Sequence, residues 1–215
     1  MYGQFFILFG LILVGYYCNK KGYLPLKTNK NVGHMVMRVT IPAMLITTIA
    51  SIEITDRVLR AFLLSAAGQI AMMVVFGFLM RQYGRKRGLD SRLLPMIDLT
   101  AGSLNTGFIG LPVTMIFFGQ AGIIYMSAGV LALNLYLWSY GVYLISDKKA
   151  TGAAAIGKSF LQGAINPNCI SILLGLLLAV THTARFVPTV VLGFLTKVGD
   201  LSTPLSLIYI GALAG

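Results

Sequence analysis

Residues 102–113 read GSLNTGFIGLPV, and they interrupt an apolar run that extends from residue 93 to residue 118. Gly107, Gly110 and Pro112 each weaken a helix, and Pro112 also lacks a backbone N–H group. Backbone groups without hydrogen-bond partners are costly in lipid, so irregular backbone is tolerated there only against protein or a water-filled cavity. A membrane helix that is broken beside a polar side chain, here Asn105, is typical of a transporter binding site.

The residues of this run suggest how such a site would work. Asn105 could donate a hydrogen bond to a substrate carboxylate, or it could be satisfied by backbone groups that the break frees. We expect an interruption between residues 105 and 112, with Gly107 and Gly110 allowing close approach of backbone and Pro112 ending one half-helix. The N-terminal end of a half-helix carries partial positive charge, which favours an anion.

Three charged residues are candidates for ion coupling. Asp98 is the one acidic residue between positions 93 and 118, and acidic groups inside a membrane are costly and usually functional. Its alternative place is the cytoplasmic interface, because it follows Arg92 closely. Lys197 and Asp200 are three residues apart, so they share a helix face and can pair, either inside the membrane near the site or at its surface.

The composition indicates an all-α polytopic membrane protein. Apolar residues make up 57% of the 215 residues, charged residues make up 11%, and the mean hydropathy is +0.82, whereas a soluble domain carries about 25% charged residues. The net charge of +11 lies in particular loops, so it indicates topology and not a nucleic-acid partner. The pattern predicts no catalytic residue, no cofactor and no metal site.

Residues 152–159 match a P-loop pattern but lack the preceding strand that a P-loop needs, so we interpret them as part of a cytoplasmic linker.

Seven apolar segments approach the length of about 20 residues that spans a bilayer. They cover residues 3–18, 32–51, 59–80, 93–118, 122–145, 165–181 and 187–213, and the fourth and seventh are long enough to be broken. Twelve Lys and Arg residues fall in the loops after segments one, three and five, and three (Arg57, Arg60, Arg185) fall in the others. By the positive-inside rule the N-terminus lies outside, in a plasma membrane that we expect to be the bacterial inner membrane.

Two short matches predict an internal repeat. Residues 9–14 resemble residues 174–179, and residues 41–45 resemble residues 203–207, at nearly the same offset. Five segments separate the repeat starts, and an odd number inverts the second copy in the membrane. We therefore expect a first five-helix repeat at 1–150, a cytoplasmic linker at 151–164, and part of an inverted second repeat at 165–215. Pro42 and Pro204 occupy matched positions, where they either hinge or line a crossing of helices, or simply kink packed helices.

The sequence NTGFIGLP at residues 105–112 resembles the auxin efflux carrier family, whose bacterial members are often described as malate or malonate permeases. Supporting matches are IPAML at 41–45, Asn134 with Trp138, NP at 166–167, and TPLSL at 203–207 with Gly211. The resemblance implies a fold similar to that of bile acid sodium symporters, with two inverted five-helix repeats whose fourth and ninth helices are broken and cross where substrate binds. The candidate substrate-binding residues are then Asn105, Gly107, Phe108, Gly110, Pro112, Pro42 and Pro204.

The expected function is secondary or passive transport of a small organic anion, a mono- or dicarboxylate, across the lipid bilayer. Coupling to protons or sodium is left open, and the spacing of Gly211 and Gly215 is a weak signal for a homodimer. The alternative is a non-transporting membrane interaction or regulatory protein, because the sequence stops inside an apolar run before a second broken helix. We accordingly expect that residues 1–215 alone do not transport.

Overall fold

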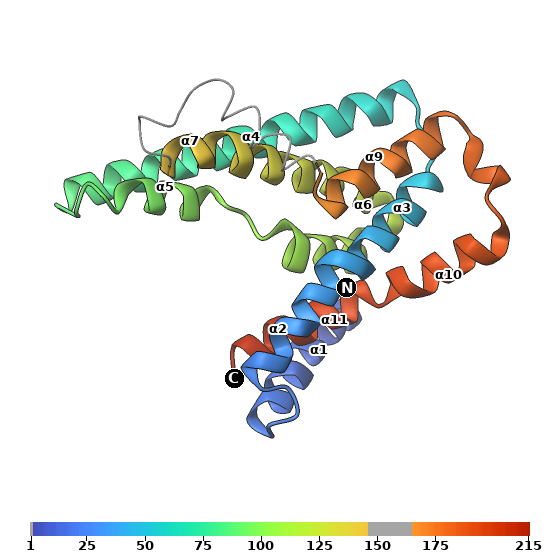
Figure 1. Ribbon diagram of the computed structural model, residues 1–215, viewed down its shortest axis with the longest axis horizontal. Helices are drawn as coiled ribbons and strands as arrows, with labels where there is room; N and C mark the ends of the chain where they lie inside the picture. Colours follow the sequence, from blue (N-terminus) through green and yellow to red (C-terminus); the bar gives the residue numbers. More distant parts are fainter. Residues whose placement is uncertain (1, 146–164) are drawn as a thin grey trace.

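The computed structural model describes residues 2–145 and 165–215, and every regular element within those ranges is a helix or helical turn (Figure 1). The elements are α1 (Tyr2–Lys20), α2 (Leu26–Met35), the π-helical turn η1 (Val36–Thr40), α3 (Ile41–Ala50), α4 (Asp56–Lys86), α5 (Leu94–Gly102), the π-helical turn η2 (Thr106–Gly110), α6 (Leu111–Leu135), the π-helical turn η3 (Tyr136–Gly141), α7 (Val142–Ile145), α9 (Pro167–Val180), the 3₁₀ turn η4 (Thr183–Phe186), α10 (Thr189–Asp200) and α11 (Ser202–Leu213). The predicted linker at 151–164, with the P-loop-like residues 152–159, lies outside the described residues.

Five helical stretches of the described chain are long and apolar enough to cross a membrane. They are Tyr2–Lys20, Lys27–Ala50, Asp56–Lys86, Leu94–Leu144 and Thr189–Leu213. The predicted fourth and fifth segments share the 51-residue stretch Leu94–Leu144, and α9 is a shorter apolar helix. The all-α polytopic membrane class is confirmed, while the number of crossings remains a prediction.

A glycine separates the fourth and fifth predicted segments. Gly119 has φ 62° and ψ −157°, outside helical geometry, in the middle of α6. This positive φ suits glycine because other residues would place a Cβ too close to the backbone. The chain therefore turns near the boundary that the hydropathy pattern predicted between residues 118 and 122.

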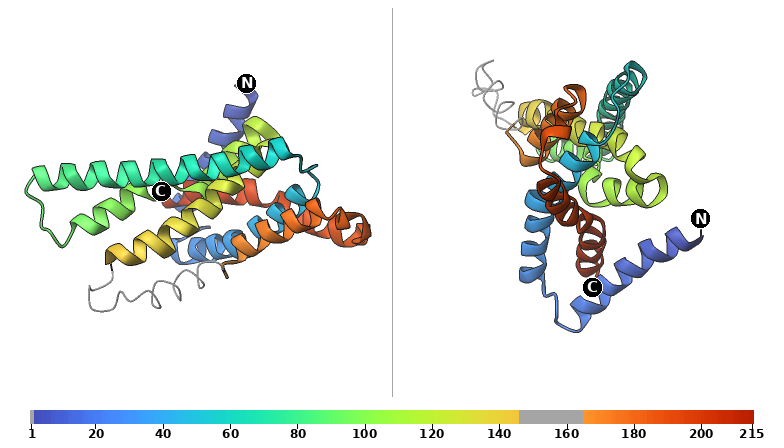
Figure 2. Two further views of the ribbon diagram at one scale, coloured as in Figure 1. Left: turned by 90° about the horizontal axis from the view of Figure 1, so that it is seen from above. Right: turned by 90° about the vertical axis from the view of Figure 1, so that its right-hand side faces the viewer.

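Helix α1 is joined to the rest of the molecule mainly through α11 (Figure 2). A Cβ at Gly15 would clash with the carbonyl oxygen of Ile208, and one at Gly211 would clash with that of Ile12. The two helices can approach this closely only because both positions are glycine. Gly211 thus packs within the chain, so the Gly211–Gly215 spacing is no longer a reason to expect a homodimer.

The second close pair of helices is α3 with α9, and α10 also packs against α3. Gly175 of α9 faces Ile49 and lies beside the carbonyl oxygen of Leu45, which would be 3.3 Å from a Cβ at that glycine. Segment one thus packs on segment seven, and segment six packs on segment two. The inverted repeat and its bounds at 1–150 and 165–215 stay predictions.

Two prolines follow the π-helical turns. Pro42 comes just after η1, and Pro112 comes just after η2. A proline lacks an N–H group and its ring crowds the carbonyl group four residues earlier, and a wider π-turn is a local solution to that conflict. The largest buried apolar cluster includes Val36 of η1, Ile41 of α3 and Leu111 of α6, so both turns are held by the core.

Candidate functional site at a broken helix

The fourth apolar segment is broken at residues 103–105. Helix α5 ends at Gly102, Ser103 is extended with φ −77° and ψ 100°, and η2 begins at Thr106. Figure 1 shows the extended connection between α5 and the next helical turn. The hydroxyl group of Ser103 donates to the carbonyl oxygen of Leu99 at 2.6 Å, which satisfies one group at the end of α5.

The break therefore overlaps the predicted interval 105–112 only at Asn105 and otherwise precedes it. Gly107 and Gly110 lie inside the π-turn, and Pro112 lies in the first turn of α6. The prediction that Pro112 ends a half-helix was wrong. The physical reason is that η2 continues into α6, since the backbone N–H of Leu111 donates to the carbonyl oxygen of Thr106, and the π-turn accommodates the proline ring inside this half-helix.

Asn105 caps the second half-helix. Its Oδ1 atom accepts a hydrogen bond from the backbone N–H of Phe108 at 3.1 Å. Because Oδ1 is the acceptor, the Nδ2 amide group points elsewhere and remains a donor. The side chain is exposed, so a ligand can reach this donor. The structure thus shows the backbone contact of Asn105, and its contact with a substrate carboxylate stays a prediction.

Helix α11 closes one side of the break through Tyr209. The ring of Phe108 stacks on that of Tyr209 with centroids 4.6 Å apart. A Cβ at Gly33 of α2 would come within 2.7 Å of the same ring, and the Asn29 amide donates to the Tyr209 carbonyl oxygen at 3.1 Å. Sequence reasoning missed Tyr209 and Asn29. Asn29 lies before the predicted start of segment two at residue 32, and the only available signal was a polar residue just ahead of an apolar run.

Gly107 and Gly110 accommodate methionine side chains. A Cβ at Gly107 would be 3.2 Å from Sδ of Met37, and one at Gly110 would clash with Cε of Met126. The predicted close approach at these glycines exists, but the groups that approach are flexible side chains and not backbone. Methionine adapts its shape readily, so these contacts can change without a large rearrangement.

The remaining predicted prolines lie in the first turns of α3 and α11. Pro42 is buried within the continuous helical stretch Lys27–Ala50, just after η1. Pro204 is half-buried and follows the turn at Leu201 between α10 and α11. Helix α11 contacts both η1 and η2, so the two segments that contain these prolines meet beside the break.

Several buried oxygen atoms around the break have no hydrogen-bond partner within the described part of the chain. They are Asn29 Oδ1, Thr106 Oγ1, Ser202 Oγ and Ser206 Oγ, on α2, η2 and α11. Buried polar atoms are nearly always paired in proteins. These atoms lie on elements that contact one another, because α11 packs against both α2 and η2, and hydropathy alone does not reveal this polar character.

The charged candidates have different environments. Asp98 is fully buried and pairs with Arg81, whose Nη1 atom is 3.5 Å from Oδ2. Lys197 and Asp200 are both exposed on α10, and no ion pair joins them among the residues that the structure describes. The predicted Lys197–Asp200 pair is wrong. A three-residue spacing permits such a contact without imposing it, and an exposed pair gains little over hydration of the two groups.

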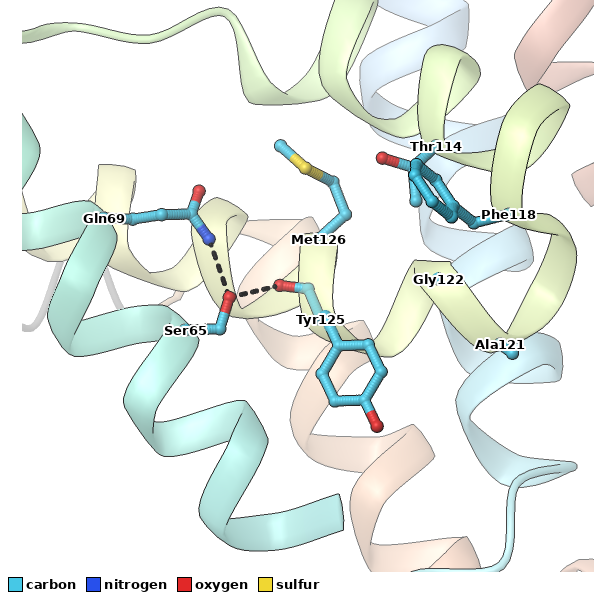
Figure 3. A pocket seen from close by; sticks show the side chains of 8 residues that line it. All are labelled: Ser65, Gln69, Thr114, Phe118, Ala121, Gly122, Tyr125 and Met126. Carbon is cyan, nitrogen blue, oxygen red and sulfur yellow. Dashed lines mark hydrogen bonds between the residues drawn. The ribbon is translucent and has the colours of Figure 1, made fainter.

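A cavity of about 450 Å³ lies between α4 and α6 (Figure 3). The side chains that line it include no charged group; they are Ser65, Gln69, Thr114, Phe118, Ala121, Gly122, Tyr125 and Met126. Ser65 donates to the Tyr125 carbonyl oxygen at 3.1 Å and accepts from the Gln69 amide at 3.1 Å. Since Met126 also covers Gly110, its side chain is shared between this cavity and η2.

Comparison with known proteins gives two matches. A family model described as "Membrane transport protein" matches residues 1–213. A protein named "Uncharacterized transporter" from Methanothermobacter thermautotrophicus is 24% identical over 204 residues, which cover 94% of this chain and 64% of the relative. This chain therefore spans less than two thirds of the length of that relative.

Proposed function

This chain belongs to the membrane transport protein family, the auxin efflux carrier family that its sequence resembles, and from that premise we propose that the natural gene product transports a small organic anion. The transport is secondary or passive, and the substrate binds at the break between α5 and η2. The protein is an integral membrane protein, in agreement with its long apolar helices. We propose the plasma membrane as its place, with the N-terminus outside.

The observation that supports this proposal most directly is the free donor of Asn105. Its Nδ2 group stands at the N-terminal end of the second half-helix, because Oδ1 is already bonded to the N–H of Phe108. A helix N-terminus carries partial positive charge and presents N–H groups, which together favour an anionic oxygen. A carboxylate at this position would accept from the Asn105 amide and benefit from the helix terminus.

The surroundings of the break favour a small substrate. Phe108 and Tyr209 form an aromatic wall, and the uncharged cavity behind Met126 can receive the part of the molecule that follows the carboxylate. Both mono- and dicarboxylates agree with these features. The other proposed contacts, at Gly107, Gly110, Pro112, Pro42 and Pro204, shape the backbone and donate no side-chain hydrogen bond.

The alternative is a membrane interaction or regulatory protein that retains this fold without transporting. The natural gene product, reconstituted in proteoliposomes, should be tested with radiolabelled mono- and dicarboxylates for uptake and for counterflow. We expect counterflow of at least one carboxylate above the level of empty liposomes, and its loss in an Asn105→Asp variant that expresses and unfolds like the wild type. A folded protein that neither binds nor exchanges any carboxylate would favour the non-transporting alternative.

A further inference from the structure

The two oxygen atoms of the Asp98 carboxylate have different surroundings. Oδ2 lies 3.5 Å from Nη1 of Arg81 and accepts a hydrogen bond from the hydroxyl group of Tyr140 at 3.0 Å. Oδ1 has no hydrogen-bond partner in the described part of the chain, although the side chain is fully buried. A buried oxygen that carries part of a negative charge and receives no donor is costly.

A second unpaired oxygen lines the same space. Tyr136 is 2% exposed, and its hydroxyl oxygen has no partner among the described residues. A Cβ at Gly77 would clash with Asp98 Oδ1 and would lie 3.0 Å from the Tyr136 oxygen, and one at Gly102 would clash with that same oxygen. Two glycines, on α4 and α5, therefore let the Asp98 and Tyr136 oxygens lie in one narrow space between α4, α5 and η3.

This arrangement fits both charge states of the carboxyl group. In the ionised form, Arg81 and Tyr140 stabilise the charge on Oδ2. In the protonated form, a proton on Oδ1 becomes a donor, and the Tyr136 oxygen is an acceptor within the same space. The charged and titratable groups that face Asp98 in the described chain are Arg81 on α4 and Tyr136 and Tyr140 on η3, while Tyr143 on α7 is exposed.

We propose that Asp98 binds the proton that accompanies the substrate, an inference that rests on the proposed transport function. The proton comes from water on one side of the membrane, forms an O–H bond at Oδ1, and leaves to water on the other side. A proton suits this space better than sodium does, because close contacts with Gly77 and Gly102 fill it and a proton needs no added volume. Asp98 lies one turn before the end of α5 at Gly102, so its charge state acts on the half-helix that leads to the break.

The two tyrosines provide a second test. The hydroxyl group of Tyr140 donates to Oδ2, and the hydroxyl group of Tyr136 shares the space of Oδ1 and can donate to it when the carboxyl group is ionised. Tyr136→Phe and Tyr140→Phe therefore each remove a donor to the ionised form, and the midpoint of the pH profile of transport should move to higher pH in both variants. Each shift should be about one pH unit, since one hydrogen bond is at stake in each case. Both substitutions keep the aromatic ring, and Tyr143→Phe on α7, where the side chain is exposed, is the matched control that should leave the midpoint unchanged.

Asp98→Asn fixes the site in a neutral form. In proteoliposomes of the natural gene product, we expect this variant to keep exchange of labelled for unlabelled carboxylate and to lose accumulation driven by a pH gradient. If it does not fold, as judged by elution and thermal unfolding in detergent, the two tyrosine variants decide. Wild-type accumulation that is indifferent to a pH gradient, or tyrosine variants whose pH profiles coincide with that of the wild type, would overturn the proton site and leave the proposed transport intact. Absence of any exchange by the wild type would instead count against the proposed function.

Discussion

The side chain of Asn105 stabilises the second half-helix and, in the proposed function, also binds the substrate. Its oxygen caps the helix through the N–H of Phe108, and the residue is exposed, with the Nδ2 amide group as a remaining donor. A substitution at this position therefore changes two quantities, the stability of the second half-helix and the affinity for substrate. Variants that separate the two are needed to assign the site.

Asn105→Ala removes both the cap and the donor. We expect a loss of about 1 kcal/mol in the free energy of unfolding, because an N-cap is lost, and about a tenfold weaker carboxylate binding, because one hydrogen bond to a charged group is lost. Thermal unfolding in detergent and counterflow assays would measure the two effects.

Asn105→Asp is the matched control for the alanine variant. It keeps an oxygen that caps Phe108 and places negative charge at a helix N-terminus, so stability should be preserved. It also replaces the donor by a negative group, so binding of an anion should fall further than with alanine. Equal binding by the wild type and the aspartate variant would remove Asn105 from the substrate site.

At the scale of elements, η2 is held between methionine side chains, and Met126 links it to the cavity beside α4. We expect Gly110→Ala to displace the Met126 side chain into that cavity and to reduce carboxylate transport several-fold, because overpacking forces neighbouring side chains to move. Adding Met126→Ala should restore much of the activity by making room. Failure of the double variant to recover would show that Gly110 is needed for backbone conformation and not for space.

The contact of α1 with α11 provides a test of helix packing. Gly15→Leu should lower the free energy of unfolding by about 1–3 kcal/mol or more, because its side chain would meet the backbone of Ile208. Gly10 lies on the same helix with open space around it, so Gly10→Leu is the matched control. Thermal unfolding in detergent would compare the two, and similar destabilisation by both would contradict the packing of α1 on α11.

At the scale of the whole molecule, the length of α4 indicates that the loops before and after this helix lie on opposite sides of the membrane. Its 31 residues correspond to about 46 Å of helix, which exceeds the hydrocarbon thickness of about 30 Å. Glu53 lies just before this helix and Lys86 ends it, and both are exposed. The positive-inside rule places the end with Lys86 in the cytoplasm.

Single cysteines introduced at these two positions would test the topology. In a background where Cys18 and Cys169 are replaced by alanine, Glu53→Cys should react with an impermeant thiol reagent added to intact cells. Lys86→Cys should react only after the membrane is opened. Reaction of both cysteines from the same side would show that the predicted topology is wrong.

The membrane class, the apolar segments and the family resemblance were predictable from the sequence because they depend on local properties. Hydropathy over about 20 residues determines which segments suit a bilayer, and the glycine- and proline-rich run indicated that the fourth segment is broken. The position of the break at 103–105 was not predictable, since Asn105 acts as a cap and the π-turn accommodates Gly107, Gly110 and Pro112.

Contacts between residues far apart in the sequence were decided only by the tertiary structure. Asp98 meets Tyr140, 42 residues away, and Asn29 meets Tyr209, 180 residues away. Gly211, whose spacing from Gly215 suggested contact with a second copy of the chain, packs against α1 of the same chain. Hydropathy and helix-breaking residues act within one segment, so the sequence shows their effect directly. The partner of a buried polar group, or of a glycine in a close helix contact, depends on which helices the fold brings together.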